Sequence, residues 1–75
     1  MSPEVKAQYK ADLARVRAER DRFREWASQK RKDYIGLKKK RRFLDALHAL
    51  DRYQEYRNSA AQFDSEAKRI QEYLK

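Results

Sequence analysis

Residues 46–74 of the chain read ALHALDRYQEYRNSAAQFDSEAKRIQEYL, and apolar side chains recur in this stretch in steps of three and four. The positions of the repeat are Ala46, Ala49, Tyr53, Tyr56, Ala60, Phe63, Ala67, Ile70 and Leu74. Such steps define a heptad seam, because they return an apolar side chain to the same side of a helix about every 3.5 residues. The stretch therefore predicts a long helix with one continuous apolar seam.

The same pattern bears on whether this stretch is one helix or two. Ser59 followed by Gln62 resembles a capping box, which would start a new helix near residue 58. The heptad phase passes through these residues without a skip, although a turn would normally reset it. One helix over residues 38–74 is the favoured prediction, and a break near residue 58 that creates a third helix is the alternative.

The N-terminal half carries a second helical pattern. Ser2 suits an N-cap, Pro3 fits the first helical turn, and Glu4 suits the positive end of the helix dipole. An apolar stripe at helical spacing follows, made of Val5, Tyr9, Leu13, Val16, Phe23, Trp26 and Ala27. Arg20 interrupts this stripe, and its methylene stem can cover the seam there.

Gly36, the only glycine in the chain, is the predicted hinge. Glycine readily takes the left-handed conformation that ends a helix, so the sequence predicts a helix over residues 3–34 and a bend over residues 35–37. Two helices of similar length joined by a short connection pack antiparallel. The expected fold is therefore an all-α, coiled-coil-like hairpin that forms a single domain over residues 1–75.

A hinge at Gly36 also fixes which residues face each other across the seam. It would set Tyr9 opposite Phe63 and Val16 opposite Tyr56. It would further place Phe23 and Trp26 opposite the alanines at the start of the second helix. Small residues on one helix would then face aromatic residues on the other, which is how a two-helix seam interdigitates.

The start of the second helix is more apolar than the seam requires. The additional side chains are Phe43, Leu44, Leu47 and Leu50, which we call the apolar patch. A two-helix hairpin covers one stripe only, so these residues would be exposed. We expect a homodimer that packs into a four-helix bundle. A three-helix bundle, in which a third helix covers the patch, and the docking of another protein are the alternatives.

Composition excludes several classes of protein. The chain has 75 residues and no cysteine, which excludes disulfides, thiolate metal sites and a cysteine nucleophile. No apolar stretch approaches the roughly 18 residues of a membrane span. The N-terminus has no basic-then-apolar signal pattern. We therefore expect a cytoplasmic protein without a membrane span, or a nuclear one in a eukaryotic or viral host.

Catalytic residues are not apparent in the sequence. His48 is the only histidine, and although Asp45 and Asp51 lie three residues away on either side, such a trio on an exposed helix is usually a set of surface groups. No glycine-rich phosphate loop, zinc spacing or nucleophile elbow is present. The sequence predicts no enzyme, no cofactor and no metal site.

Positive charge is concentrated in one part of the chain. The net charge is +8, and residues 15–42 hold thirteen basic residues against four acidic ones, whereas the residues on either side are close to neutral. Unrelieved like charge destabilises a small fold, so this block indicates an anionic partner. In a hairpin, it would occupy the bend and the adjoining half of the first helix.

Nucleic acid is the leading candidate for that partner, because clustered lysine and arginine neutralise backbone phosphates. The residues expected to contact it are Lys30, Arg31, Lys32, Tyr34, Lys38, Lys39, Lys40, Arg41 and Arg42. Among these, the ring of Tyr34 either stacks on an unpaired base or packs against its neighbours to close the bend. The alternative function is a protein-interaction module, in which the apolar patch docks on a partner helix and the basic end meets an acidic protein surface.

Overall fold

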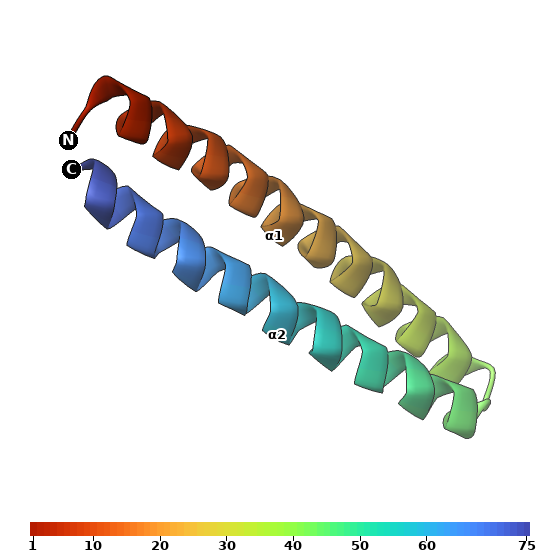
Figure 1. Cartoon of the computed structure of the whole chain (residues 1–75). Coiled ribbons are helices and arrows are strands. Elements are labelled where there is room, and N and C mark those ends of the chain that lie inside the picture. Colours follow the sequence, from red (N-terminus) through yellow and green to blue (C-terminus); the bar gives the residue numbers. More distant parts are fainter.

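The two predicted helices are present and fold back on each other as an antiparallel hairpin. The computed structural model describes all of residues 1–75, with helix α1 (Pro3–Lys39), helix α2 (Phe43–Leu74) and no strand. The molecule is a rod of 58 × 13 × 13 Å. Both termini lie at one end, which we call the open end, and the connection forms the bend end (Figure 1). The all-α hairpin is confirmed.

Both helices keep the features that their sequences predict. The Ser2 hydroxyl accepts a hydrogen bond of 3.2 Å from the N–H of Val5, so the predicted N-cap of α1 is confirmed. Helix α2 runs without interruption through Asn58 and Ser59. The seam explains this continuity, because a turn there would pull Tyr56 and its neighbours out of register with α1. The third helix, and the three-helix bundle with it, are wrong.

The predicted hinge is wrong by about one helical turn. Gly36 lies inside α1, which continues to Lys39, and the connection is made by residues 40–42 rather than 35–37. Two effects outweigh the cost of a helical glycine, which is only about 1 kcal/mol. Leu37 becomes half-buried at the next seam position, and the following lysines are good helix formers. Helix α2 accordingly starts at Phe43 and not at residue 38.

Moving the bend shifts the pairing of residues across the seam. Tyr9 stacks on Tyr73 with ring centroids 5.6 Å apart, and not on Phe63 as a hinge at Gly36 required. Phe23 instead stacks on Phe63, also at 5.6 Å. The first pair is centred on residue 41 and the second on residue 43, so the pairings predicted from a bend at Gly36 are displaced.

The remaining predicted pairings are wrong for the same reason. Val16 packs in a cluster with Ala67 and Ile70 rather than opposite Tyr56. Trp26 lies 5.6 Å from Tyr56, centroid to centroid, and not opposite the alanines at the start of α2. Periodicity predicted the seam residues of α2, whereas Val5 and Trp26 of the stripe predicted in α1 are exposed. The partners of the seam residues depend on the position of the bend.

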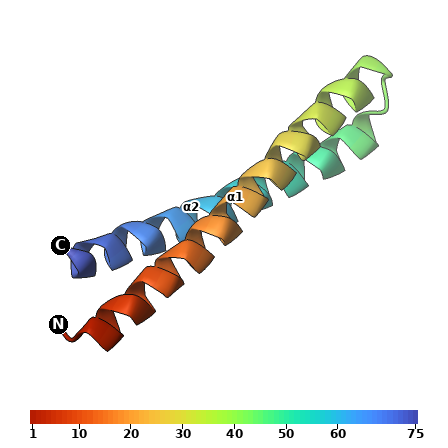
Figure 2. The ribbon, with the colours of Figure 1, turned by 90° about the horizontal axis from the view of Figure 1, so that it is seen from above.

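The hydrophobic interior is thin and uneven along the rod. Every seam position predicted in α2 is buried or half-buried, so the heptad assignment is confirmed. Five of the eight buried residues are alanines, and the larger buried side chains, Leu13, Val16 and Ile70, all lie toward the open end. Figure 2 shows the two helices crossing near the middle of the rod. The larger buried side chains are therefore remote from the bend end.

Candidate nucleic-acid interface

The bend is built from three consecutive cations, Lys40, Arg41 and Arg42. The N–H of Arg41 donates to the carbonyl of Lys38 at 3.1 Å, and that of Arg42 donates to the carbonyl of Leu37 at 3.0 Å. These are the two hydrogen bonds of a Schellman motif, which normally has glycine at the left-handed position. Here Arg41 occupies it, with φ 60°. A side chain in this conformation costs roughly 1–2 kcal/mol.

Arg42 is the second residue at the bend that local structure does not favour. It is the N-cap of α2 and makes no side-chain capping hydrogen bond. Ser, Asp or Asn is preferred at an N-cap, and a cation there faces the positive end of the helix dipole. By contrast, Lys38 and Lys39 lie in the last turn of α1, where the dipole favours positive charge. The backbone conformation and the helix dipole thus favour the lysines but not the two arginines, and the local partner of Arg42 is the side chain of Asp45 in the first turn of α2.

Most of the predicted phosphate-contacting cations have no acidic partner. Lys30 pairs with Asp33 at 3.7 Å, and Arg42 pairs with Asp45 at 2.6 Å. The other six cations have no carboxylate oxygen within 4.0 Å, and all of them are exposed: Arg31, Lys32, Lys38, Lys39, Lys40 and Arg41. The bend end is therefore a surface of largely uncompensated positive charge.

The structure brings some of the predicted residues together and separates others. Residues 38–42 are contiguous at the bend. Residues 30–32 lie at least one helical turn back along α1 and point in three directions, because successive residues of a helix are rotated by about 100°. Tyr34 is half-buried, and the ammonium group of Lys38 lies 5.8 Å from its ring centroid. This ring packs at the seam and is partly covered.

The apolar patch lies beside these cations. Phe43, Leu44 and Leu47 are 58%, 76% and 54% exposed, whereas Leu50 is half-buried. Ile35 on α1 is also exposed, and periodicity did not single it out. The predicted excess of uncovered apolar side chains near the bend is therefore present.

A groove flanks the seam between the bend end and the middle of the rod. Arg24, Ser28 and Arg31 of α1 line it together with Tyr53 and Arg57 of α2, and its volume is about 430 Å³. We call it the basic groove. Sequence reasoning missed it, because Arg24 was counted only among the thirteen basic residues of 15–42 and Arg57 lies in a part of the chain with balanced charge.

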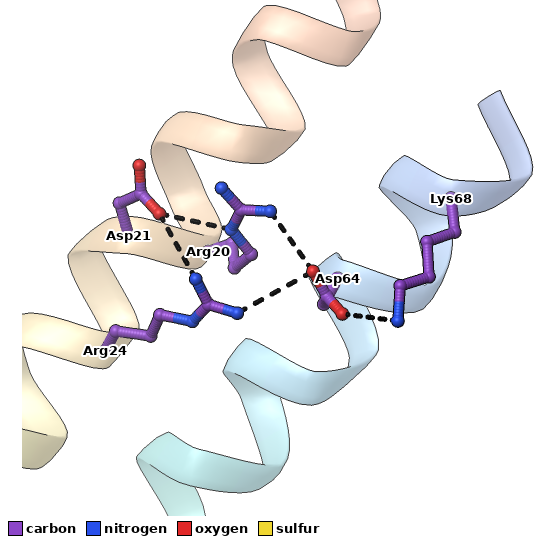
Figure 3. A network of polar contacts seen from close by, with 5 residues as sticks. All are labelled: Arg20, Asp21, Arg24, Asp64 and Lys68. Carbon is purple, nitrogen blue, oxygen red and sulfur yellow. Dashed lines mark hydrogen bonds and ion pairs between the residues drawn. The ribbon is translucent and has the colours of Figure 1, made fainter. Parts of the chain in front are cut away.

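A network of charged side chains includes Arg24 and Asp64, which both line the basic groove, and Figure 3 shows this network. Arg20 occupies the interrupted seam position of α1 and donates to Asp64 of α2 at 3.1 Å. Asp64 also pairs with Lys68 at 3.1 Å and Arg24 at 3.7 Å. Asp21 accepts from Arg20 at 3.1 Å. Arg20 thus joins the two helices where the apolar stripe is broken.

This network shifts the pKa values of its central pair. Hydrogen bonds from Lys68 and then Arg20 hold the pKa of the Asp64 carboxyl below its usual value. Hydrogen bonds to Asp21 and Asp64 raise the pKa of the Arg20 guanidinium. Both groups are therefore fixed in their charged forms, as a cross-helix ion pair requires.

Comparisons with known proteins add no family to this description. No protein-family model matches the chain, and neither a curated protein nor a solved structure is significantly similar to it. In the structure, neither helix is sufficiently long and apolar to cross a membrane. No three His, Cys, Asp or Glu side chains are grouped so that they could hold a metal ion.

Proposed function

We propose that this protein is a non-enzymatic nucleic-acid-binding protein that contacts phosphates through its bend end. The observation that carries the proposal is the identity of residues 41 and 42. Glycine at the first position and serine or aspartate at the second would stabilise the connection, yet both are arginine. Residues that oppose local stability commonly occur at functional sites, where another requirement decides them.

The surrounding charges support the same function. Six cations near the bend have no carboxylate within ion-pair distance, so their charge is available to an external anion. Binding to phosphates would release condensed counterions, which makes the expected affinity sensitive to salt and tolerant of sequence. Tyr34 contributes to closing the seam in this proposal, because its ring is already half-buried and partly covered.

The experiment compares two variants that lose the same charge at opposite ends of the rod. Lys39→Gln with Arg41→Asn removes two cations at the bend, and asparagine tolerates the left-handed backbone. Lys6→Gln with Arg69→Gln removes two unpaired cations near the open end. We expect the bend variant to lose at least tenfold in affinity for a short duplex, with a salt slope reduced by about 1.8, because each phosphate contact contributes about 0.9. Equal affinities for the two variants would reject the proposal.

We also propose that the apolar patch joins two copies of the chain in a homodimer. The interior supports this, because it is made largely of alanines and a chain of this length needs additional burial. Phe43, Leu44 and Leu47 are exposed and supply such a surface. In sedimentation equilibrium we expect a dimer that Leu44→Gln with Leu47→Gln converts to a monomer. A wild-type chain that stays monomeric at high concentration would exclude it.

The same patch supports a second candidate function, that of a protein-interaction module. An exposed apolar surface bordered by cations fits an amphipathic helix of another protein that also carries acidic residues. A wild-type monomer that binds such a helix through Leu44 and Leu47, and retains no nucleic acid after a salt wash, would favour this module over the first proposal.

A further inference from the structure

A row of cations repeats every seven residues along α1. The row consists of Lys10, Arg17, Arg24, Arg31 and Lys38. Residues seven apart in a heptad helix lie on the same side, and this row directly flanks the seam. All five side chains are exposed. The row therefore forms one lateral face of the hairpin, and it extends from near the open end to the bend.

The opposite flank of the seam has a different composition. The residues of α1 at the corresponding positions are Asp12, Glu19, Trp26, Asp33 and Lys40. Three of these five are acidic, whereas the cationic row contains no acidic residue at all. The two lateral faces of the rod thus differ in charge along α1 from Lys10 to Asp33, whereas both are cationic at the bend end.

Helix α2 does little to neutralise the cationic row. Its residues on the same side are Phe43, Leu50, Arg57, Asp64 and Gln71. Asp64 is the only acidic residue among them, and Arg20 and Lys68 already engage it at 3.1 Å each. Its distance to Arg24 is longer, at 3.7 Å. The row keeps most of its positive charge for an external partner.

The basic groove is the middle of this face. Arg24 and Arg31 contribute from α1, and Arg57 contributes from α2. Neither Arg31 nor Arg57 has a carboxylate oxygen within 4.0 Å. The guanidinium of Arg57 lies 5.6 Å from the ring centroid of Tyr53 and donates to its hydroxyl at 3.5 Å, which holds the guanidinium in place. Three arginines from two helices thus line one groove together with a single carboxylate, Asp64, so the groove has an excess of guanidinium groups, which suit a phosphate.

We propose that the cationic row, with the basic groove at its centre, binds the backbone of a nucleic-acid duplex laid along the rod. This inference rests on the nucleic-acid binding proposed above and names the form of its ligand. The row spans about 42 Å at 1.5 Å per residue. That length corresponds to about 12 base pairs, because a B-form strand carries one phosphate per 3.4 Å or so.

The choice of a duplex follows from what this face lacks. Proteins that hold single strands usually present exposed aromatic rings on which unpaired bases stack. On this face the one exposed aromatic side chain is Phe43, at the bend end; between Lys10 and Arg31 there is none, and Tyr53 is half-buried beneath Arg57. Between Lys10 and Arg31 the groups that the face offers to a ligand are mainly guanidinium and ammonium groups, so it addresses phosphates rather than bases.

The test removes three arginines from one lateral face or from the other side of the rod. The face variant is Arg24→Gln, Arg31→Gln and Arg57→Gln. The control variant is Arg15→Gln, Arg22→Gln and Arg69→Gln, which removes the same charge from exposed positions outside the row. Fluorescence anisotropy with a duplex of about 14 base pairs measures affinity and salt slope, and circular dichroism verifies that each variant remains helical.

We expect the face variant to lose about a hundredfold in duplex affinity at about 0.1 M salt, with a salt slope lower by roughly 2.7. The control variant should change by less than threefold. We also expect a single strand of the same length to bind the wild type more weakly than the duplex does. A face variant with wild-type affinity, or a single strand that binds more tightly, would overturn the inference.

The bend variant distinguishes a failure of the lateral-face proposal from a failure of the proposed nucleic-acid binding itself. If Lys39→Gln with Arg41→Asn weakens binding and the face variant does not, nucleic-acid binding stands and the lateral face is excluded. If the wild type binds neither duplex nor single strand at low salt, both proposals fail. A face variant that unfolds is replaced by Arg24→Lys, Arg31→Lys and Arg57→Lys, which keeps the charge but should lose about tenfold because lysine cannot bind phosphate in a bidentate manner.

Discussion

The two ends of the rod are built according to different requirements. At the open end, Ser2 caps α1, Pro3 occupies its first turn, and the larger aliphatic residues such as Ile70 close the interior. At the bend end, Arg41 holds a left-handed backbone, Arg42 leaves α2 without a side-chain cap, and apolar side chains are exposed. The cap and the first turn of α1 and the buried aliphatic cluster at the open end favour the fold, although Val5 and Tyr73 are exposed there. Several local choices at the bend oppose the fold.

The binding that we propose for the bend end would account for this difference. Natural sequences are locally consistent with their folds, and the exceptions tend to coincide with functional sites. A short bend could have been stabilised by substitutions at two positions, residues 41 and 42, without any change to the seam. Their being arginine is most simply explained by a need for positive charge at this point of the surface.

The largest expected effect tests whether the packing is concentrated at the open end. Ile70→Ala should lower the free energy of unfolding by about 3 kcal/mol, since it empties part of the Leu13–Val16–Ala67–Ile70 cluster. Leu37→Ala, near the bend, should lower it by about half as much, because Leu37 is only half-buried. Urea unfolding followed by circular dichroism measures both. A greater loss at Leu37 would contradict the contrast between the ends.

The next effect concerns the two helix N-termini. Ser2→Ala should lower stability by about 1 kcal/mol, because it removes the hydroxyl that accepts from the N–H of Val5. Arg42→Ser should raise stability by about 0.5–1 kcal/mol, because α2 gains the side-chain cap that it lacks. Thermal unfolding of the two variants checks the opposite signs. A loss of stability in Arg42→Ser would mean that arginine is favoured there by the fold itself.

The helical fold class could be predicted from the sequence because it depends on the spacing of apolar residues. The heptad seam of α2, the cap at Ser2 and the uncovered apolar patch each follow from residue spacing or residue type. The position of the bend did not follow, because the strongest local signal for a helix end is glycine. In this chain Gly36 is helical, and Arg41 takes the conformation that glycine would favour.

The sequence predicted only that part of the candidate site which does not depend on the position of the bend. The run of cations at residues 38–42 is contiguous in sequence and stays together in any hairpin. The basic groove is different, because it requires Arg57 to lie beside Arg24 and Arg31. A hinge at Gly36 would instead have set Arg57 opposite the region of Arg15. A shift of about one turn in the bend thus decides which arginines meet.

A third prediction concerns Gly36 and Arg41, because the glycine is helical and the arginine has the left-handed conformation that glycine would favour. Gly36→Ala should stabilise the protein by about 0.5–1 kcal/mol, because a Cβ at this helical position meets no atom within 4 Å. Arg41→Gly should stabilise it by a similar or smaller amount, since glycine adopts a positive φ without steric cost. Arg41→Ala should give no comparable gain, because alanine retains the Cβ. Destabilisation by Gly36→Ala would restore Gly36 as the hinge.

The smallest expected effect lies at the boundary between the two regions, in the network around Asp64. The pKa of Asp64 is lowered in the folded protein, so its contribution to stability is present above the pKa of the unfolded chain, about 3.9, and is lost as the pH falls through the lower folded value. Asp64→Asn should therefore flatten the acid side of a plot of melting temperature against pH. The matched change Asp51→Asn, at an exposed aspartate without an ion pair within 4.0 Å, should leave that slope closer to the wild type. If both variants follow the wild-type curve below about pH 4, the Arg20–Asp64 pair does not hold the helices together, and the break in the seam at Arg20 is stabilised by its methylene stem alone.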